Sequence, residues 1–211
     1  MSVIKLEGVG KNFQDKEIIK ELNLEVELGE MVAIVGKSGK GKSTLLNMIG
    51  LISEKTNGDL YICGKKNVKI HSKDAIMLRR KKIGYLFQNY ALADDETVLW
   101  NLELALVYKN IAKSEKRVRI DSVLEQLGLL ELKKIPVYKL SGGEQQRVAM
   151  ARLILQESEV ILADEPTGSL DTENRDIILE LLKQLKKQGK AVVIVTHDSY
   201  VAQACDRVIT L

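Results

Sequence analysis

The sequence predicts an α/β fold built around a mostly parallel sheet, with an antiparallel β part near its N-terminal end. Short, strongly apolar runs recur along the chain and are separated by helical patterns, as is typical of buried parallel strands. Two early stretches instead alternate apolar and polar residues, which indicates half-buried antiparallel strands. With 211 residues and 45% hydrophobic content, the chain can bury the core of one domain.

The strands are predicted in order from the N-terminus. The antiparallel strands are Val3–Glu7 and Ile18–Glu27, which flank the turn-like Gln14-Asp15-Lys16, and Asp59–Ile62. The parallel strands are Met31–Val35, Ile83–Phe87, Val160–Ala163 and Ala191–Val195, with Val208–Leu211 as a last strand. The first parallel strand leads into a helix that begins near Lys42 and continues through Leu45–Ile49.

Helical patterns dominate between Gln88 and Glu159. The predicted helices are Val98–Tyr108, Ser114–Leu127 and Gly143–Leu155. We expect Ser114 to cap the second of these helices and Gly128 to end it. Its predicted core-facing stripe is Val118, Val123, Leu124 and Leu127. We therefore expect a single domain, 1–211, in which 1–88 and 159–211 form the core with its antiparallel β part and 89–158 form a helical subdomain.

The composition excludes several classes of protein. Lys and Arg total 32 against 29 Asp and Glu, and the charges are dispersed, so we expect no nucleic-acid partner. The longest apolar runs are far shorter than the roughly 18 residues of a membrane span, so we expect any membrane passage to belong to another chain. The N-terminus has no long apolar signal core, and Cys63 and Cys205 are expected to be reduced thiols of a cytosolic protein.

A glycine-rich stretch lies between the strand Met31–Val35 and the helix that follows it. The stretch reads Gly36-Lys37-Ser38-Gly39-Lys40-Gly41-Lys42-Ser43-Thr44. A strand before and a helix after are the context that a phosphate-binding P-loop requires. Its glycines let successive N–H groups face phosphate, and the helix start adds a positive dipole end. We expect this segment to bind a nucleoside triphosphate through Gly36, Ser38, Gly39, Gly41, Lys42, Ser43 and Thr44.

Two carboxylates, Asp164 and Glu165, come directly after the buried strand Val160–Ala163. Asp164 should emerge at the carboxyl edge of the sheet, where it can hold Mg²⁺ through water together with the Ser43 hydroxyl. Glu165 is placed to polarise an attacking water; an ion-pair role for these acids is the alternative. His71 lies in a polar stretch and is expected to be solvated.

One further motif, with those above, indicates a family. The stretch Leu140-Ser141-Gly142-Gly143-Glu144-Gln145-Gln146-Arg147 precedes the strand and acid pair Val160-Ile161-Leu162-Ala163-Asp164-Glu165 at a short distance. Together with the P-loop, these motifs resemble the ATPase subunits of ABC transporters, and the resemblance covers the whole chain in order. It implies a P-loop NTPase core of the ABC ATPase type, ATP hydrolysis, and ATP and Mg²⁺ as cofactors.

The resemblance also implies roles for individual residues. Phe13 would stack on adenine, although an ordinary core or edge-strand Phe is the alternative. Gln88 corresponds to the Q-loop glutamine, which contacts the metal or attacking water, and Ser169-Leu170-Asp171 to the D-loop, with Asp171 at the nucleotide. His197 corresponds to the switch histidine that bonds the γ-phosphate and Glu165. The implied catalytic residues are Glu165, His197, Gln88 and Lys42, and the implied metal-binding residues are Ser43, Gln88 and Asp164.

Ser141, Gly142 and Gly143 begin a helix, and the resemblance implies that they cover ATP held by a second copy of the chain in a head-to-tail homodimer. Two positions depart from the commonest family pattern. Glu144 stands where Gln is usual, and Lys40 where a small residue is usual. We expect Lys37 and Lys40 to point toward solvent, which leaves Lys42 for phosphate.

A finer resemblance rests on Gly84-Tyr85-Leu86-Phe87-Gln88-Asn89, Asp95-Glu96-Thr97-Val98, 163–171 and 206–211. In these stretches the chain resembles the branch of lipoprotein-release, macrolide-efflux and bacteriocin-export ATPases, with the lactococcin-type bacteriocin exporters as the most similar group. We therefore expect an ATP-hydrolysing subunit, peripheral on the cytoplasmic face of the membrane, that powers export through a separate transmembrane permease. A regulatory module that moves a membrane partner without transport is the alternative. Tyr90, Leu92, Leu99 and Trp100 are the candidate contacts with that partner, although core positions are as reasonable for Leu99 and Trp100.

Overall fold

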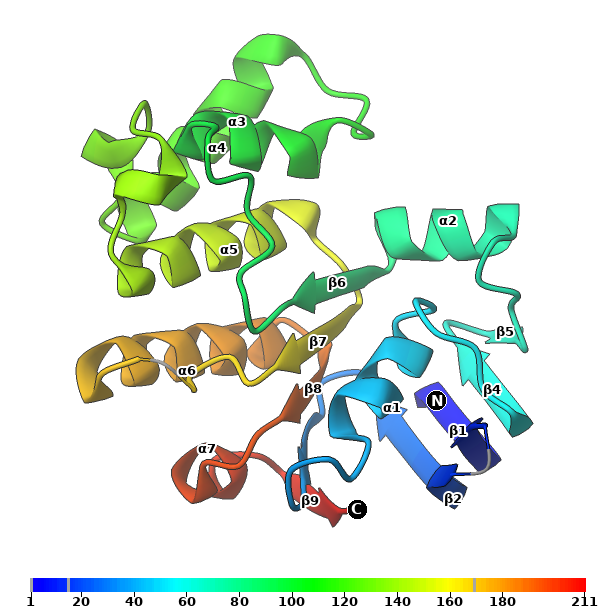
Figure 1. The fold of residues 1–211 in the computed structure, drawn as a ribbon. Helices are drawn as coiled ribbons and strands as arrows, with labels where there is room; N and C mark the ends of the chain where they lie inside the picture. Colours follow the sequence, from blue (N-terminus) through cyan, green and yellow to red (C-terminus); the bar gives the residue numbers. More distant parts are fainter. Residues whose placement is uncertain (1, 15, 169) are drawn as a thin grey trace.

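The computed structural model describes residues 2–14, 16–168 and 170–211, and its central element is a five-stranded parallel sheet. The strands follow the order β6-β7-β8-β3-β9 (Figure 1). They are β3 (Met31–Val35), β6 (Ile83–Leu86), β7 (Val160–Asp164), β8 (Ala191–Val195) and β9 (Arg207–Thr210). All four pairings in this sheet are parallel, as the short apolar runs predicted. The predicted α/β fold class is therefore confirmed.

A second, antiparallel sheet follows the order β2-β1-β4-β5. Its strands are β1 (Ser2–Phe13), β2 (Lys16–Glu27), β4 (Asn57–Ile62) and β5 (Lys65–Lys66). β1 is longer than the predicted Val3–Glu7, because register shifts toward β2 let pairing continue through Gly8 in its left-handed conformation to Phe13. Asp15, in the predicted turn, lies outside the described residues.

Helices cover both faces of the parallel sheet. On one face, α1 (Lys42–Ile49) packs under the antiparallel sheet; on the other lie α5 (Gly142–Gln156), α6 (Thr172–Lys187) and α7 (Ser199–Gln203). The strands alternate between these two cores. In β8, Val193 and Val195 pack with α1, whereas Val192 and Ile194 pack with α5 and α6. Because both faces are covered there, β3, β7 and β8 are apolar and buried almost throughout, which is why these runs were visible in the sequence, whereas the edge strand β9 is largely exposed.

The segment after β6 is helical, as predicted, but its elements differ in detail. It contains α3 (Val98–Glu103), a 3₁₀ turn (Leu104–Leu106), α4 (Lys113–Gln126) and two further 3₁₀ turns (Leu130–Leu132 and Val137–Lys139) before α5. The predicted helix Val98–Tyr108 is therefore shorter and ends in a 3₁₀ turn. α2 (Lys73–Lys81) precedes β6.

Two predictions for α4 are wrong. Ser114 is not its N-cap, because the helix already begins at Lys113 after Ala112, whose side chain cannot cap. Val118 is 67% exposed, whereas Ile120 is fully buried with Leu124. Val118 is therefore not part of the core, whereas Leu124 and Leu127 of the predicted stripe are buried and Val123 packs against the core. Gly128 does follow the end of the helix in a left-handed conformation (φ +67°), as expected for a C-terminal stop.

Neither a membrane-crossing helix nor a disulfide occurs in the described part of the chain. None of its helices has both the length and the apolar character that crossing a membrane requires. Cys63 and Cys205 are both free thiols, as predicted. His71 is exposed, as predicted.

Asn101, fully buried in α3, holds the loop that leads from β6 into the helical segment. Its side chain accepts a hydrogen bond from Ala93 N at 2.8 Å and donates to Ala93 O and Thr97 O, both at 3.1 Å. We expect Asn101→Ala to lower the free energy of unfolding by about 2 to 4 kcal/mol, because buried backbone groups lose their partners. Urea denaturation measures this change. Asn110→Ala, at an exposed position, is the control, and a loss below about 0.5 kcal/mol in Asn101→Ala would contradict the assignment.

Candidate functional site

The P-loop residues leave the end of β3 and enter α1 at Gly41. Gly41 adopts φ +87°, and a Cβ there would lie 2.6 Å from the side chain of Ile18. Only glycine fits this position. Because Gly41 has no side chain to cap α1, the first N–H groups of the helix are left for a ligand. The loop and helix start therefore have the geometry of an anion site.

Lys42, the first residue of α1, folds back over this loop. Its ammonium donates hydrogen bonds to Gly36 O at 2.9 Å and Lys37 O at 3.2 Å. Lys37 and Lys40 are both exposed, as predicted. Lys42 is therefore the lysine of this segment that is held directly above the loop.

Ser43 and Asp164 meet at the carboxyl edge of the parallel sheet. Ser43 Oγ donates to Asp164 Oδ1 across 3.0 Å. Burial raises the pKa of Asp164 above its usual range, while the hydrogen bond from Ser43 and the nearby Lys42 charge oppose this shift. The sequence predicted that these two side chains would converge. Both offer the hard oxygen ligands that Mg²⁺ prefers.

Glu165 and His197 form a second pair at the same edge, because β7 and β8 are neighbours. His197 Nδ1 lies 2.9 Å from Glu165 Oε2. Glu165 has a left-handed backbone (φ +46°), uncommon for a residue other than glycine, and its N–H donates to Val195 O at 2.9 Å. The Glu165 side chain is largely buried, whereas that of His197 is 70% exposed. The imidazole can therefore reach a bound ligand while it orients the carboxylate.

Phe13 lies beside the P-loop at the end of β1. It is 52% exposed and lines a groove of about 270 Å³ with Ile18 and P-loop residues that include Ser38, Lys42 and Thr44. The ammonium of Lys11 lies 4.8 Å from the ring centroid. Phe13 is therefore not a core residue, which contradicts that part of the alternative, and its ring is accessible to a flat ligand.

Gln88 is exposed just beyond the end of β6, the strand that pairs with β7. It therefore lies at the carboxyl edge of the sheet, the edge that also carries Asp164. After it, Tyr90 and Ala91 have left-handed backbones, and Arg152 of α5 donates to both of their carbonyls, at 2.8 and 2.5 Å. The segment after Gln88 is therefore attached to α5.

Ser141, Gly142 and Gly143 lie apart from the P-loop. They begin α5, and Figure 1 shows this end of the helix on the far side of the molecule from α1. Among the described residues, no hydrogen bond or ion pair joins these three residues to the P-loop. Within one chain, the structure does not bring them to the groove beside Phe13.

Two side chains that sequence reasoning missed connect α5 to the segment after β7. Gln146 is buried and donates to Pro166 O at 2.6 Å, directly after Glu165. Asn174 accepts a hydrogen bond from Arg147 and donates to Asp171 Oδ2 at 2.8 Å. A Cβ on Gly143 would lie 2.7 Å from Asn174, so this glycine also permits the close approach of α5 and α6. The sequence signals were the motif 140–147, which contains Gln146 but does not reveal its partner, and the helix-capping spacing of Asp171 and Asn174.

Asp171, assigned to the nucleotide by resemblance, caps α6 in this structure. Its Oδ1 accepts a hydrogen bond from Asn174 N at 2.8 Å. Hydrogen bonds from the backbone and side chain of Asn174 hold the pKa of Asp171 below its usual range. Ser169 of the same motif lies outside the described residues.

With this geometry established, comparison with known proteins identifies the family. A family model described as ABC transporter matches residues 19–168. The chain belongs to the ABC transporter family. It is an ATP-binding domain of this family and an ATPase.

The relatives of this ABC domain include macrolide exporters. The macrolide export ATP-binding/permease protein MacB of Pectobacterium atrosepticum is 42% identical, and the match covers 100% of this chain and 33% of that protein. MacB of Bartonella henselae is 40% identical, with coverage of 100% and 32%. The chain therefore spans about a third of the length of these relatives.

Solved structures of ABC cassettes share the fold. The ATP-binding cassette MJ0796, in a dimeric post-hydrolysis state bound to ADP and phosphate, is 39% identical with a TM-score of 0.90; the match covers 99% of this chain and 94% of that one. CbiO1 from Clostridium perfringens, part of the transporter complex cbiONQ, is 31% identical with a TM-score of 0.86, covering 99% and 84%. The predicted P-loop ABC fold is confirmed.

Proposed function

We propose that this ABC ATPase powers export through a transmembrane permease, by hydrolysing ATP between two copies of the chain. The observation that carries the proposal is the convergence of Lys42, Ser43, Asp164, Glu165 and His197 at the carboxyl edge of three adjacent strands, β7, β8 and β3. In open α/β sheets, ligands bind at this edge.

The P-loop would bind the β- and γ-phosphates. The N–H groups at the start of α1 face outward, and the Lys42 ammonium would exchange its carbonyl partners for phosphate oxygens. Gly36, Ser38, Gly39, Gly41 and Thr44 complete this cradle. Phe13 would stack on the base, a contact that reads a π-face rather than base edges, so the preference for ATP over other nucleotides should be modest.

Ser43 and Asp164 fit Mg²⁺ by their oxygen chemistry and their 3.0 Å separation. Among the described residues, no group of three or more His, Cys, Asp or Glu side chains could hold a metal ion. This fits an ion that takes its other ligands from ATP, from water and from Gln88. When bound, Mg²⁺ neutralises charge on the phosphates.

Glu165 would orient and polarise the attacking water. His197 engages Oε2 of this carboxylate, which leaves Oε1 for the water. The exposed His197 would also hydrogen-bond the γ-phosphate and so align water, carboxylate and phosphorus. Phosphoryl transfer depends mostly on such positioning and on charge neutralisation.

Ser141, Gly142 and Gly143 would complete the site from a second copy. Their distance from the P-loop within one chain supports this arrangement, and the dimeric state of MJ0796 bound to ADP and phosphate supports it independently. A two-fold head-to-tail dimer would place ATP at both interfaces, with Asp171 near the partner's nucleotide. In this proposal residues 89–158 act as a helical subdomain that moves relative to 1–88 and 159–211.

The proposed membrane partner is a permease, and the chain would act on the cytoplasmic face of the membrane. The MacB relatives, named as ATP-binding/permease proteins for macrolide export, support an export function. We propose a bacteriocin, an antimicrobial peptide or a related hydrophobic compound as cargo, on the motif resemblance. ATP-dependent export from vesicles that contain the full-length protein and its permease tests this function. Stimulated ATPase activity without movement of cargo would favour the regulatory alternative.

The permease would dock on an exposed apolar surface of the helical subdomain. Of the four candidates from the sequence, Tyr90, Leu92 and Leu99 are partly buried and pack against the core, whereas Trp100 is exposed. The exposed apolar residues near Trp100 define what we name the α3 surface: Trp100, Leu104, Val107 and Tyr108. This surface follows the segment that begins at Gln88, which Asn101 and Arg152 hold in place. Nucleotide contact at Gln88 could therefore reach it.

We expect the double variant Trp100→Ser/Leu104→Ser to weaken stimulation of ATPase activity by the permease about tenfold or more. Exposed aromatic and aliphatic anchors carry most of the binding energy of an interface. Basal hydrolysis and nucleotide binding should change little, because neither side chain reaches the site. ATPase assays with and without reconstituted permease measure the effect. Val118→Ser, which alters another exposed apolar residue, is the matched control; equal stimulation in both variants would exclude the α3 surface.

A further inference from the structure

The start of α5 already carries an anion in this structure, and that anion is the side chain of Glu144. Its Oε2 accepts a hydrogen bond from Ser141 N at 2.7 Å and another from Ser141 Oγ at 2.9 Å. Ser141 Oγ in turn accepts from Glu144 N at 3.3 Å, which completes a capping box. The Ser141 hydroxyl therefore donates its only proton to a carboxylate of its own chain.

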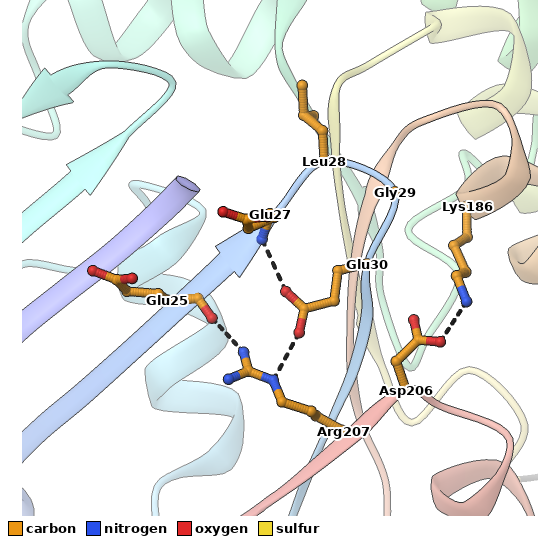
Figure 2. Close-up of a pocket in the computed structure, with 8 residues that line it drawn as sticks. All are labelled: Glu25, Glu27, Leu28, Gly29, Glu30, Lys186, Asp206 and Arg207. Carbon is orange, nitrogen blue, oxygen red and sulfur yellow. Dashed lines mark hydrogen bonds and ion pairs between the residues drawn. The ribbon is translucent and has the colours of Figure 1, made fainter. Parts of the chain in front are cut away.

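A separate acidic pocket lies at the turn between β2 and β3, and its carboxylates already have partners. Glu25, Glu27, Glu30 and Asp206 line it, and Arg207 and Lys186 engage its carboxylates and the carbonyl of Glu25 (Figure 2). These contacts bridge β2, β3, α6 and β9 and tie the two sheets together. The Glu144 contact differs, because it occupies a group that the proposed function requires.

We propose that Glu144 competes with the γ-phosphate of the partner-bound ATP for Ser141, and so sets how tightly ATP closes the dimer. This inference rests on the proposed head-to-tail dimer. Both anions are favoured at the same place, the positive end of α5, and both need the Ser141 hydroxyl as donor. When the dimer closes on ATP, the Glu144 carboxylate must lose its hydrogen bond from the Ser141 hydroxyl. It must also stay close to the triphosphate, which repels it because both groups are negative. Glu144 is thus a positioning residue that acts through Ser141.

The residue type at this position decides the strength of the competition. A Gln side chain retains an oxygen that can accept from Ser141 N, so it preserves the capping box. It lacks the negative charge, and a neutral acceptor binds a hydroxyl less strongly than a carboxylate does. Glu144 therefore weakens ATP-driven closure relative to the Gln that is commonest in the family, without weakening the helix itself.

The test measures dimerisation in a chain that holds ATP without hydrolysing it. In a Glu165→Gln background, we expect Glu144→Gln to lower the dimer dissociation constant at saturating ATP by about three- to tenfold, measured by sedimentation velocity over a range of protein concentrations. The gain should shrink as salt is raised, because it comes from an exposed charge. The thermal unfolding temperature of the monomer should fall slightly, because α5 loses a favourable charge in its first turn, whereas a purely capping role would leave the dissociation constant of the dimer unchanged.

Glu115→Gln in the same background is the matched control, since it removes the same charge from the first turn of α4, outside the site. It should leave the dissociation constant unchanged. If the parent dimerises with ATP but Glu144→Gln does not tighten the dimer, or tightens it no more than Glu115→Gln, the competition is wrong and the proposed function stands. If the parent shows no ATP-dependent dimer at all, both the competition and the proposed dimer are wrong.

Discussion

Glu165→Gln is expected to bind ATP normally but to lower steady-state hydrolysis by about 10²- to 10⁴-fold, the usual contribution of a positioned general base. The amide keeps the size of the side chain and can still accept from His197, so the local geometry should persist. It cannot attract the proton of the attacking water. Since hydrolysis releases the dimer in the proposed cycle, the ATP-bound dimer of this variant should also become long-lived.

Phosphate release and equilibrium nucleotide binding, measured on the same preparation, separate chemistry from binding. Glu159→Gln is a suitable control, because Glu159 directly precedes the opposite end of β7 and forms a partly exposed ion pair with Lys82. It should retain near-normal activity. Hydrolysis by Glu165→Gln within tenfold of the wild type would show that another group activates the water.

The sequence predicted the catalytic edge well because buried parallel strands are short, apolar and followed at once by polar residues. Asp164 ends β7, Glu165 follows it directly, and His197 lies two residues beyond the end of β8. These side chains lie close together because the two strands are neighbours in the sheet. The P-loop was equally visible, since its glycines and flanking elements are local in the sequence. Local sequence patterns predict the individual strands and loops, and parallel pairing of the strands then brings their carboxyl ends to one edge of the sheet.

What the sequence did not reveal depends on packing between distant segments. The contact of Asn174 with Arg147 joins residues 27 positions apart, and no periodicity marks it. In α4 the apolar residues are too sparse to define one face, so Val118 was assigned to the core that Ile120 occupies. The spacing of Ser141 and Glu144 is that of a capping box and can be recognised in the sequence. Only the structure shows that the Ser141 hydroxyl donates its proton to the Glu144 carboxylate.

Mixing two inactive variants is expected to restore part of the activity, if the site is shared between chains. Lys42→Ala removes the phosphate contact and should weaken ATP binding itself. Ser141→Ala removes the donor that would reach the partner's γ-phosphate, together with the N-cap of α5, which contributes about 1 kcal/mol to stability. Each homodimer then carries the same lesion in both sites, so neither should turn over ATP at an appreciable rate.

In a heterodimer of these variants, the intact P-loop of one chain faces the intact segment Ser141-Gly142-Gly143 of the other. One composite site then contains no lesion, and the second contains both. In a random equimolar mixture, half of the dimers are heterodimers, and each heterodimer has one intact site out of two. We therefore expect about one quarter of the wild-type ATPase rate. The measurement is phosphate release from mixtures of differently tagged chains, with heterodimers verified by sequential capture.

The matched control mixes Lys42→Ala with Ser43→Ala. Both changes lie in the P-loop, so every composite site of that heterodimer has a lesion, and no recovery should occur. Recovery confined to the first mixture would mean that Ser141 acts on the nucleotide of the other chain. The opposite result would be verified heterodimers of Lys42→Ala and Ser141→Ala that are as inactive as either homodimer. It would contradict a site shared between chains, because one site of each heterodimer has both of its halves intact.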